Sequence, residues 1–549
     1  MQPCLVRLAA GLVILLCAFT APVSAAVRET VEAQIDALRQ LVERQQAQLD
    51  AQQHQLETQR AELDALKGQA TVPAAPPAVP SDSQRIEELE RKAAQSKLAA
   101  QEAPVVRMNA SRPSITSADG RSSIAVRANV QLDYAHYDQA PAGSPETDFR
   151  RGSVGANSRE NDAARDLSDG AYFRRARLGV EGIIASDFGY RLLLELGGSG
   201  TEGPTRIKDA YLTYTGFAPF AFQLGAFSPP ANFADGTSTE DLLFIERPTP
   251  AELSRALGGA AGRIGVGTRV GGSRWLGALT LTGRTVNDAE VFDSQRAVVG
   301  RLGGLVATAP DYNVHLGANG TYVFDPPQQS MSGDVQYPVR FRDRPEIRVD
   351  STRLVDTGTV NADNAFSAGI EFAANWKNLL LQAENYWYGI ERRASTLPDP
   401  EFGGYYIEAS WIPTGESRRY APASAAFQAP RPRFPFDGIG GWGAWELALR
   451  YSHTDLNFHE GLAGTEAPLG SVRGGEQSIF GAGVNWYPNT NVKLMFNYLH
   501  IDVDRLNPAG PDNLTPFGSS PATPPLGVER PEPGCLRASV AVQLLTTIN

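Results

Sequence analysis

The sequence predicts an all-β membrane protein, a 16-stranded antiparallel transmembrane β-barrel with an N-terminal α-helical coiled coil. Three observations lead to this fold class. From about residue 120 onward, apolar and polar residues alternate with a period of two in sixteen segments. The gaps between these segments alternate between short and long, and residues 29–67 carry a heptad repeat. The 549 residues are also more than one compact soluble core usually holds.

The first 25 residues are expected to be a signal peptide. Arg7 precedes an apolar run from Leu8 to Thr20, and small residues follow at Ser24 and Ala25. Leu16 before Cys17 does not fit a lipidation signal. Once the signal is removed, Cys535 is the one cysteine left, so the sequence predicts no internal disulfide and no metal or other cofactor.

Residues 29–67 are predicted to form a periplasmic coiled coil that drives trimerisation. The a positions hold Ile35, Val42, Leu49, Leu56 and Leu63. Glutamines at several d positions would weaken the seam but fix its register. Residues 68–104 are rich in Pro and Ala and are expected to be a linker with a short helix.

The barrel domain is expected over residues 105–549. The sixteen predicted strands lie near residues 124–138, 171–184, 189–197, 206–215, 220–227, 262–270, 274–285, 297–309, 312–324, 365–375, 378–390, 404–413, 442–453, 476–488, 491–503 and 535–545. Long loops lie on one side and short turns on the other, as in outer-membrane barrels. Residues 414–441 break this rule, because they form a long segment on the short-turn side. A fold into the lumen is one option for that segment.

One stretch illustrates the alternation. Trp445, Leu447, Leu449 and Tyr451 share one face of an extended chain, and the opposite face carries the charged Glu446 and Arg450. A barrel strand meets hydrocarbon on one face and water on the other, which fits this pattern. A soluble β-sandwich also alternates. The strand number, the signal peptide and aromatic residues at segment ends favour the barrel.

Several sequence blocks are distinctive, among them FRRARLGVEG (173–182), RFRDRPEIRVDSTRLVDTG (340–358), FGGYYIEASWIPTGESRRY (402–420) and GVNWYPNTNVKLMFNYLHIDV (483–503). These blocks resemble the phosphate-selective porin O/P family of bacterial outer membranes. The resemblance implies a trimer of barrels, each with its own pore. It also implies that residues 228–261, 325–364 and 414–441 narrow the pore. Two departures stand out: the chain ends LLTTIN where such porins have a terminal aromatic, and the third loop is acidic.

Selectivity would rest on charges along the lumen. Strand parity gives ten basic and eight acidic lumen-facing residues, which is nearly balanced. The predicted anion path consists of Arg127, Arg174, Arg175, Arg177, Arg191, Arg340, Arg342, Arg344, Arg418 and Arg419. The predicted constriction-loop acids, set against these arginines, are Asp235, Glu240, Asp241 and Glu246. Many of these arginines could instead pair with neighbouring carboxylates and hold the loops.

The sequence therefore predicts an outer-membrane porin for passive diffusion of small hydrophilic solutes, favouring phosphate or other anions. Its expected partners are outer-membrane lipid, two further copies in a homotrimer, and small anionic solutes. The alternatives are a weakly selective general porin and a closed barrel that anchors a periplasmic tether, with peptidoglycan as partner. No histidine lies in a nucleophile motif, so no enzyme is expected. The net charge of -11 argues against nucleic acid.

Overall fold

The computed structural model describes a large part of the chain. The described residues are 91, 103–109, 112–139, 167, 169–198, 206–260, 262–288, 292–350, 352–462, 465, 467–506 and 535–548. The chain divides into two compact units, residues 1–97 and 98–549, and Arg91 is the described residue of the first. The predicted signal peptide, the coiled coil and nearly all of the linker lie outside the described residues. In the described part of the chain, no helix is long and apolar enough to cross a membrane.

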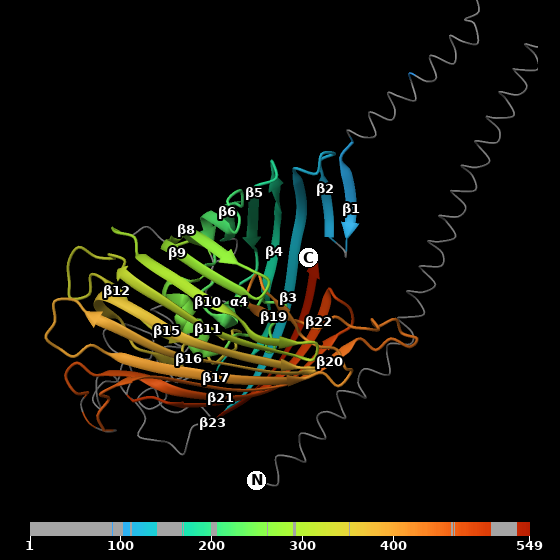
Figure 1. Cartoon of the computed structure of the whole chain (residues 1–549). Coiled ribbons are helices and arrows are strands. Elements are labelled where there is room, and N and C mark those ends of the chain that lie inside the picture. Colours follow the sequence, from blue (N-terminus) through green and yellow to red (C-terminus); the bar gives the residue numbers. More distant parts are fainter. Residues whose placement is uncertain are drawn as a thin grey trace, which may run out of the picture. The chain divides into compact units, whose positions relative to one another are not determined.

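One antiparallel sheet dominates the second unit (Figure 1). Its principal strands are β3 (Ser123–Gln139), β4 (Gly170–Ile184), β5 (Phe188–Glu195), β6 (Arg206–Tyr214), β7 (Phe220–Phe227), β8 (Arg263–Gly271), β9 (Trp275–Thr285), β10 (Arg296–Ala309), β11 (Tyr312–Asp325), β15 (Val360–Trp376), β16 (Leu379–Arg392), β17 (Glu401–Trp411), β20 (Ala444–Phe458), β21 (Val472–Tyr487), β22 (Val492–Asp504) and β23 (Cys535–Ile548). Each pairs antiparallel with the next in this series. The last strand, β23, pairs with β3.

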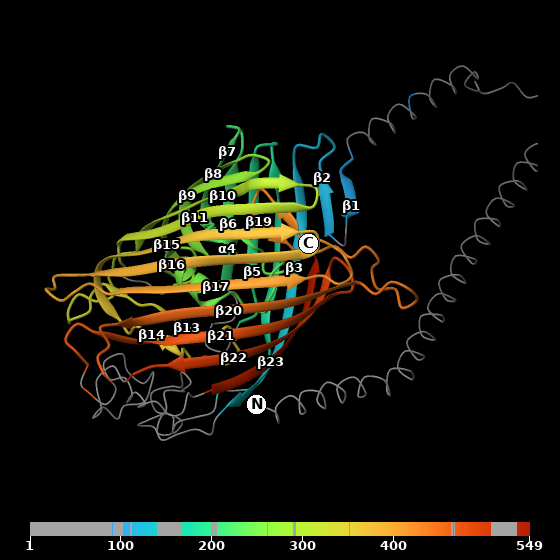
Figure 2. The ribbon, with the colours of Figure 1, turned by 60° about the horizontal axis from the view of Figure 1, so that its bottom comes forward.

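Shorter elements complete the fold (Figure 2). β1 (Val105–Asn109) and β2 (Arg112–Thr116) form a hairpin, and β2 pairs with the start of β3. Within the long connections lie α4 (Phe233–Gly236), α5 (Thr249–Gly258), β12 (Pro338–Val339), β13 (Arg342–Asp343), β14 (Val355–Asp356), β18 (Arg419–Ala421) and β19 (Ala426–Gln428). β13 pairs with β14, and β18 with β19, as separate two-stranded ribbons.

The prediction of an all-β, antiparallel fold is confirmed. Each segment predicted as a strand from its alternation falls on one of the principal strands. The β1–β2 hairpin was not predicted, because five-residue strands such as VVRMN and RPSIT are too short to show a period of two.

The polarity of the sheet is the reverse of that of a soluble protein. On β20, Leu449 is 55% exposed and the next residue, Arg450, is 2% exposed. The same inversion recurs on β10, where Leu302 is exposed and Arg301 is buried, and on β15, where Ile370 is exposed and Glu371 is buried. A sheet whose charged face is covered and whose apolar face is open suits hydrocarbon on the open side.

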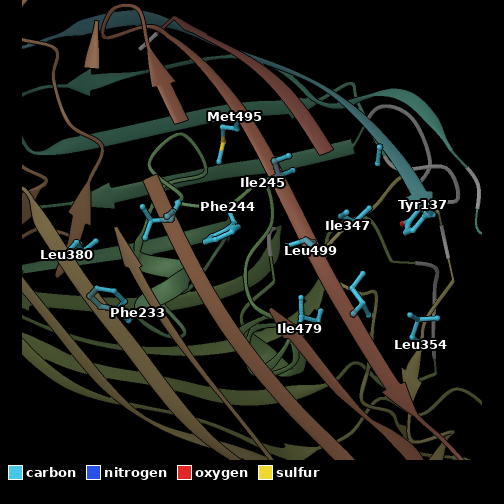
Figure 3. Packing of buried hydrophobic residues seen from close by; sticks show 14 of the residues in the cluster. Tyr137, Phe233, Phe244, Ile245, Ile347, Leu354, Leu380, Ile479, Met495 and Leu499 are labelled. Atoms are coloured by element: carbon cyan, nitrogen blue, oxygen red, sulfur yellow. The ribbon is translucent and has the colours of Figure 1, made fainter. Parts of the chain in front are cut away.

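Two long connections fold against the covered face. Phe244 and Ile245, between β7 and β8, pack in one apolar cluster with Ile479 of β21 and Leu499 of β22 (Figure 3). A second cluster joins Leu253 and Leu257 of α5 to Phe341 of the β11–β15 connection, to Tyr388 of β16 and to residues of β10, β11, β15 and β17. Apolar contacts therefore hold these connections to strands β10 to β22, and no described residue of strands β4 to β9 belongs to either cluster.

Candidate functional site

A cavity of about 1030 Å³ lies between the inward connections and strands β4 to β9. Its lining includes the basic residues Arg174, Arg175, Arg177, Arg206, Lys208, Arg247, Arg255, Arg269, Arg340, Arg342, Arg348 and Arg353. The acidic residues of the lining are Glu195, Asp235, Glu252, Asp288 and Asp343. Cations thus outnumber anions by more than two to one, although the whole chain has a net negative charge.

Bulges in two strands increase this positive charge. In β4, Arg175 lies opposite Gln131 and Phe173 lies opposite Leu132, so Arg174 is an extra residue. Arg174 and Arg175 are consequently both buried, although strict alternation would turn Arg174 outward. β6 has a similar shift at Lys208, whose flanking residues pair with consecutive positions of β5. Each bulge brings a second charged side chain to the covered face.

Glu246 joins the inward connection to the arginines of β4. Its carboxylate accepts hydrogen bonds from Nε and Nη2 of Arg174, the second at 3.1 Å. Arg175 and Arg348 approach the same carboxylate at 3.6 Å and 3.4 Å. Burial opposes ionisation of Glu246, but the three guanidinium groups outweigh it and hold its pKa well below the usual range. Glu246 therefore stays charged and fixes the connection to the wall.

A second ionic cluster surrounds α5. Glu252 accepts a hydrogen bond from Arg255 at 3.2 Å and another from Arg348 at 3.2 Å. Arg255 also contacts Asp235 at 2.5 Å. Burial opposes ionisation of Glu252, but Arg255, Arg348 and Arg247 lower its pKa to about 2. These pairs orient the helix and leave its one arginine, Arg255, largely neutralised.

Two arginines of the cavity lining differ from the others in the contacts of their guanidinium groups. Over the described ranges, Arg269 of β8 and Arg342 of β13 form no hydrogen bond or ion pair through their guanidinium groups, while every other basic residue of the lining has a partner. Arg269 is half-buried and Arg342 is exposed. A guanidinium with five free N–H donors is a ready partner for an oxyanion.

Asp343 adds a titratable group beside Arg342. Burial raises the pKa of Asp343 to about 6, with Arg348 and Arg353 opposing the rise and Glu252 adding to it. Partial desolvation by the surrounding protein and the nearby Arg340 lower the pKa of Arg342, although much of its side chain is exposed. The balance of charge in this part of the cavity is therefore sensitive to mildly acidic pH.

The structure brings together some of the residues predicted for the anion path. Arg174, Arg175, Arg177, Arg340, Arg342 and the loop acid Asp235 line the cavity. Arg177 is paired with Glu195 at 2.7 Å, and Arg340 is paired with Asp356 at 2.6 Å.

The other predicted residues lie outside the lining. Arg127 and Arg191 share Glu181, at 3.1 Å and 2.7 Å. Arg344 is almost completely buried, Arg418 is buried against Glu446, and Arg419 is exposed.

Of the four predicted loop acids, Glu246 contacts the arginines of the wall directly. Glu240 accepts a hydrogen bond from Asn129 at 3.0 Å, and Asp241 accepts one from the backbone of Ala429 at 2.7 Å. Asp235 pairs within its own connection, with Arg255. Three of the four acids thus tie the connection to other parts of the protein, and Asp235 stabilises the connection itself.

Seven cavity cations were absent from the predicted path although their segments were known: Arg206, Lys208, Arg247, Arg255, Arg269, Arg348 and Arg353. The bulge at Lys208 follows from pairing with β5, which sequence parity alone does not reveal. In the described part of the chain, no group of three or more His, Cys, Asp or Glu side chains is arranged to hold a metal ion.

A Caulobacter vibrioides protein of uncharacterized function is 26% identical over 450 residues, which cover 80% of this chain and 80% of that protein. Porin O of Pseudomonas aeruginosa is 24% identical over 361 residues, which cover 62% of this chain and 78% of that protein.

Among solved structures, an anion-selective porin from Comamonas acidovorans aligns with a TM-score of 0.42 at 13% identity, over 78% of this chain and 99% of that one. OmpT of Vibrio cholerae aligns with a TM-score of 0.40 at 10% identity, over 78% and 99%. The family described as phosphate-selective porin O and P matches residues 142–517, which is more than half of the chain. The chain therefore belongs to the phosphate-selective porin O and P family.

Proposed function

We propose that this chain is an outer-membrane porin whose water-filled channel favours small anions such as phosphate. The observation that carries the anion preference is the cavity, with its excess of arginines and the two, Arg269 and Arg342, that lack partners. A porin lowers the barrier for a hydrated solute by offering a wet path and compensating charge. Its family membership supports the channel, and the cavity supports the sign of the preferred charge.

The proposed architecture is a closed transmembrane barrel of sixteen strands. The antiparallel pairing from β3 through β23 and back to β3 supports it. The exposed apolar face supports contact with lipid, because backbone groups in hydrocarbon must all be paired within a closed sheet. Aromatic side chains at strand ends, such as Tyr312 and Trp376, which lie opposite each other, suit the membrane interface.

Three inward segments are proposed to narrow the channel: residues 228–261, 325–364 and 414–441. The first is supported by the packing of Phe244 and by the Glu246–Arg174 pair. Carbonyl oxygens of Ser424 and Ala425, in the third, accept hydrogen bonds from Arg301 of β10 at 2.7 Å and 2.8 Å. Low-dielectric walls on both sides would strengthen the field of the arginines on a passing anion.

Assembly is also proposed to follow the sequence prediction: a signal peptide over residues 1–25, a trimerising periplasmic coiled coil over 29–67, and a linker over 68–104. A three-stranded coiled coil and a trimer of barrels would share one threefold axis. Crosslinking of the purified protein would report the number of copies.

The test is single-channel recording in a planar bilayer under a KCl gradient, with and without millimolar phosphate. We expect a reversal potential of anionic sign and a current that phosphate reduces. Arg269→Gln and Arg342→Gln should each weaken the phosphate effect, whereas Arg274→Gln removes the same charge at an exposed short turn and should leave it unchanged.

A large conductance without anion preference would replace the proposal with a general porin. An absence of conductance would favour a closed barrel acting as a tether.

A further inference from the structure

The connection between β17 and β20 contains a short apolar loop that points away from the cavity. This rim loop, residues 431–442, follows the inward β18–β19 ribbon. Phe434 is 73% exposed, Ile439 is 96% exposed and Trp442 is 72% exposed, and Phe436 is also open. In Figure 2 the orange connection between β17 and β20 extends past the ends of these strands. So many large apolar side chains in twelve residues indicate a contact surface rather than chance exposure.

The rim loop has a fixed shape. The Asp437 carboxylate accepts hydrogen bonds from the backbone N–H groups of Ile439, Gly440 and Gly441, at 2.8 to 2.9 Å. The backbone N–H of Phe436 donates to the carbonyl oxygen of Pro488 at 2.7 Å, which ties the loop to the end of β21. Gly438, with a φ of +74°, supplies the left-handed turn that other residues rarely adopt. The apolar side chains are therefore held open by the backbone.

The loop continues a belt of aromatic residues at the strand ends. Trp445 and Trp486 face each other across β20 and β21, and their rings stack at 5.5 Å. The Trp486 indole N–H donates to the carbonyl oxygen of Trp442 at 2.9 Å, and Phe436 packs edge-on against Trp486 at 5.4 Å. Aromatic belts of this kind mark the level where hydrocarbon meets lipid headgroups.

The charges of the loop match the same environment. Arg431 and Arg433 are exposed, and within the described ranges neither side chain forms an ion pair. Asp437, the acidic residue of the loop, is engaged with its own backbone. Guanidinium groups beside apolar side chains are the pattern of a segment that lies in the membrane interface and binds lipid phosphates.

We propose that the rim loop is a membrane anchor, with Phe434, Ile439 and Trp442 inserted among phospholipid chains at the short-turn side of the barrel. Arg431 and Arg433 bind headgroup phosphates of anionic phospholipids. The inference rests on the membrane placement in the proposed function but not on anion selectivity. It restricts the part of segment 414–441 that narrows the channel to residues 414–430, because residues 431–442 contact the bilayer.

The experiment places an environment-sensitive fluorophore on the loop. In a background with Cys4, Cys17 and Cys535 replaced by serine, Ile439→Cys is labelled with a nitrobenzoxadiazole dye and reconstituted in vesicles containing phosphatidylglycerol. The matched control is Leu469→Cys, which is 86% exposed in the β20–β21 connection at the other end of these strands. Lipids brominated along the acyl chain should quench the label at residue 439 at least about two-fold and leave that at residue 469 nearly unchanged.

A second variant tests the charges. Arg431→Gln with Arg433→Gln should reduce the extra quenching seen in anionic vesicles, compared with vesicles of phosphatidylcholine alone. An unquenched label at residue 439 in channels that still conduct would overturn the anchor while leaving the porin intact. A label that is shielded but unquenched, and that crosslinks to another copy of the chain, would also overturn it and make the loop a subunit contact.

Discussion

Arg418 donates two parallel hydrogen bonds to the Glu446 carboxylate, from Nε to Oε1 at 2.7 Å and from Nη2 to Oε2 at 2.8 Å. The pair is almost completely buried and joins the inward segment after β17 to the wall strand β20. Burial opposes the charge on Arg418, but Glu446 outweighs it and raises the pKa of Arg418 well above its usual range. The ion pair therefore stays charged and fixes the third inward segment to β20.

Arg418→Gln should destabilise the folded protein by about 3–5 kcal/mol, because it leaves the buried Glu446 carboxylate without its paired guanidinium. The measurement is urea unfolding in detergent micelles. Arg419→Gln is the matched control, since the neighbouring arginine is exposed, and it should change stability by less than about 0.5 kcal/mol. Equal losses of stability in the two variants would show that the Arg418–Glu446 pair does not stabilise the fold.

Phe244→Ala should loosen the first inward segment. The ring is fully buried, and Arg450 lies over its face at 4.2 Å. Removing it should cost about 3–5 kcal/mol and raise the open-channel current noise as the segment moves. The control is Phe292→Ala, an exposed phenylalanine. A quiet, unchanged channel in the Phe244 variant would show that the segment is held by its ionic contacts alone.

Glu246→Gln should make the channel more selective for anions. The change removes the counter-charge of three cavity arginines, Arg174, Arg175 and Arg348. The permeability ratio of chloride to potassium should rise, and Arg342→Gln should lower it, because the two substitutions shift the cavity charge in opposite directions. Reversal potentials of both variants, measured in the same salt gradient, check the sign. If the two substitutions shifted the reversal potential in the same direction, the charge of the cavity would not be what sets the selectivity.

Mild acid should strengthen anion preference through Asp343. With a pKa of about 6, this carboxylate is ionised at neutral pH and becomes neutral as the pH falls below that value. Glu252, whose pKa is about 2, remains charged through the same window. The anion-to-cation permeability ratio should rise roughly 1.5- to 3-fold between about pH 7.5 and 5. The Asp343→Asn variant should show the high permeability ratio at both pH values. If the ratio still rose on acidification in this variant, another group would be responsible for the pH dependence.

The positions of the strands, and which side of each strand is exposed, could be predicted from the sequence. The partners of individual side chains could not. The alternation around Leu449 and Arg450 correctly gave the exposed and buried faces of β20, because the two sides of such a strand meet different surroundings. The inward turn of Arg174 depends on a bulge against β3, and two successive arginines in FRRAR are the local hint of it. Pairing of Arg174 with Glu246 joins residues 72 positions apart, and nothing local specifies such a contact.

The β1–β2 hairpin has a mechanical consequence. β2 pairs with the start of β3, and β1 pairs with β2 through Val105 opposite Thr116 and Asn109 opposite Arg112. A force applied to the chain ahead of Val105 would first peel β1 from β2, one residue pair after another. The seam where β23 meets β3 would carry load only after this short ribbon had opened. The hairpin would thus protect the β23–β3 pairing from a force on the preceding chain.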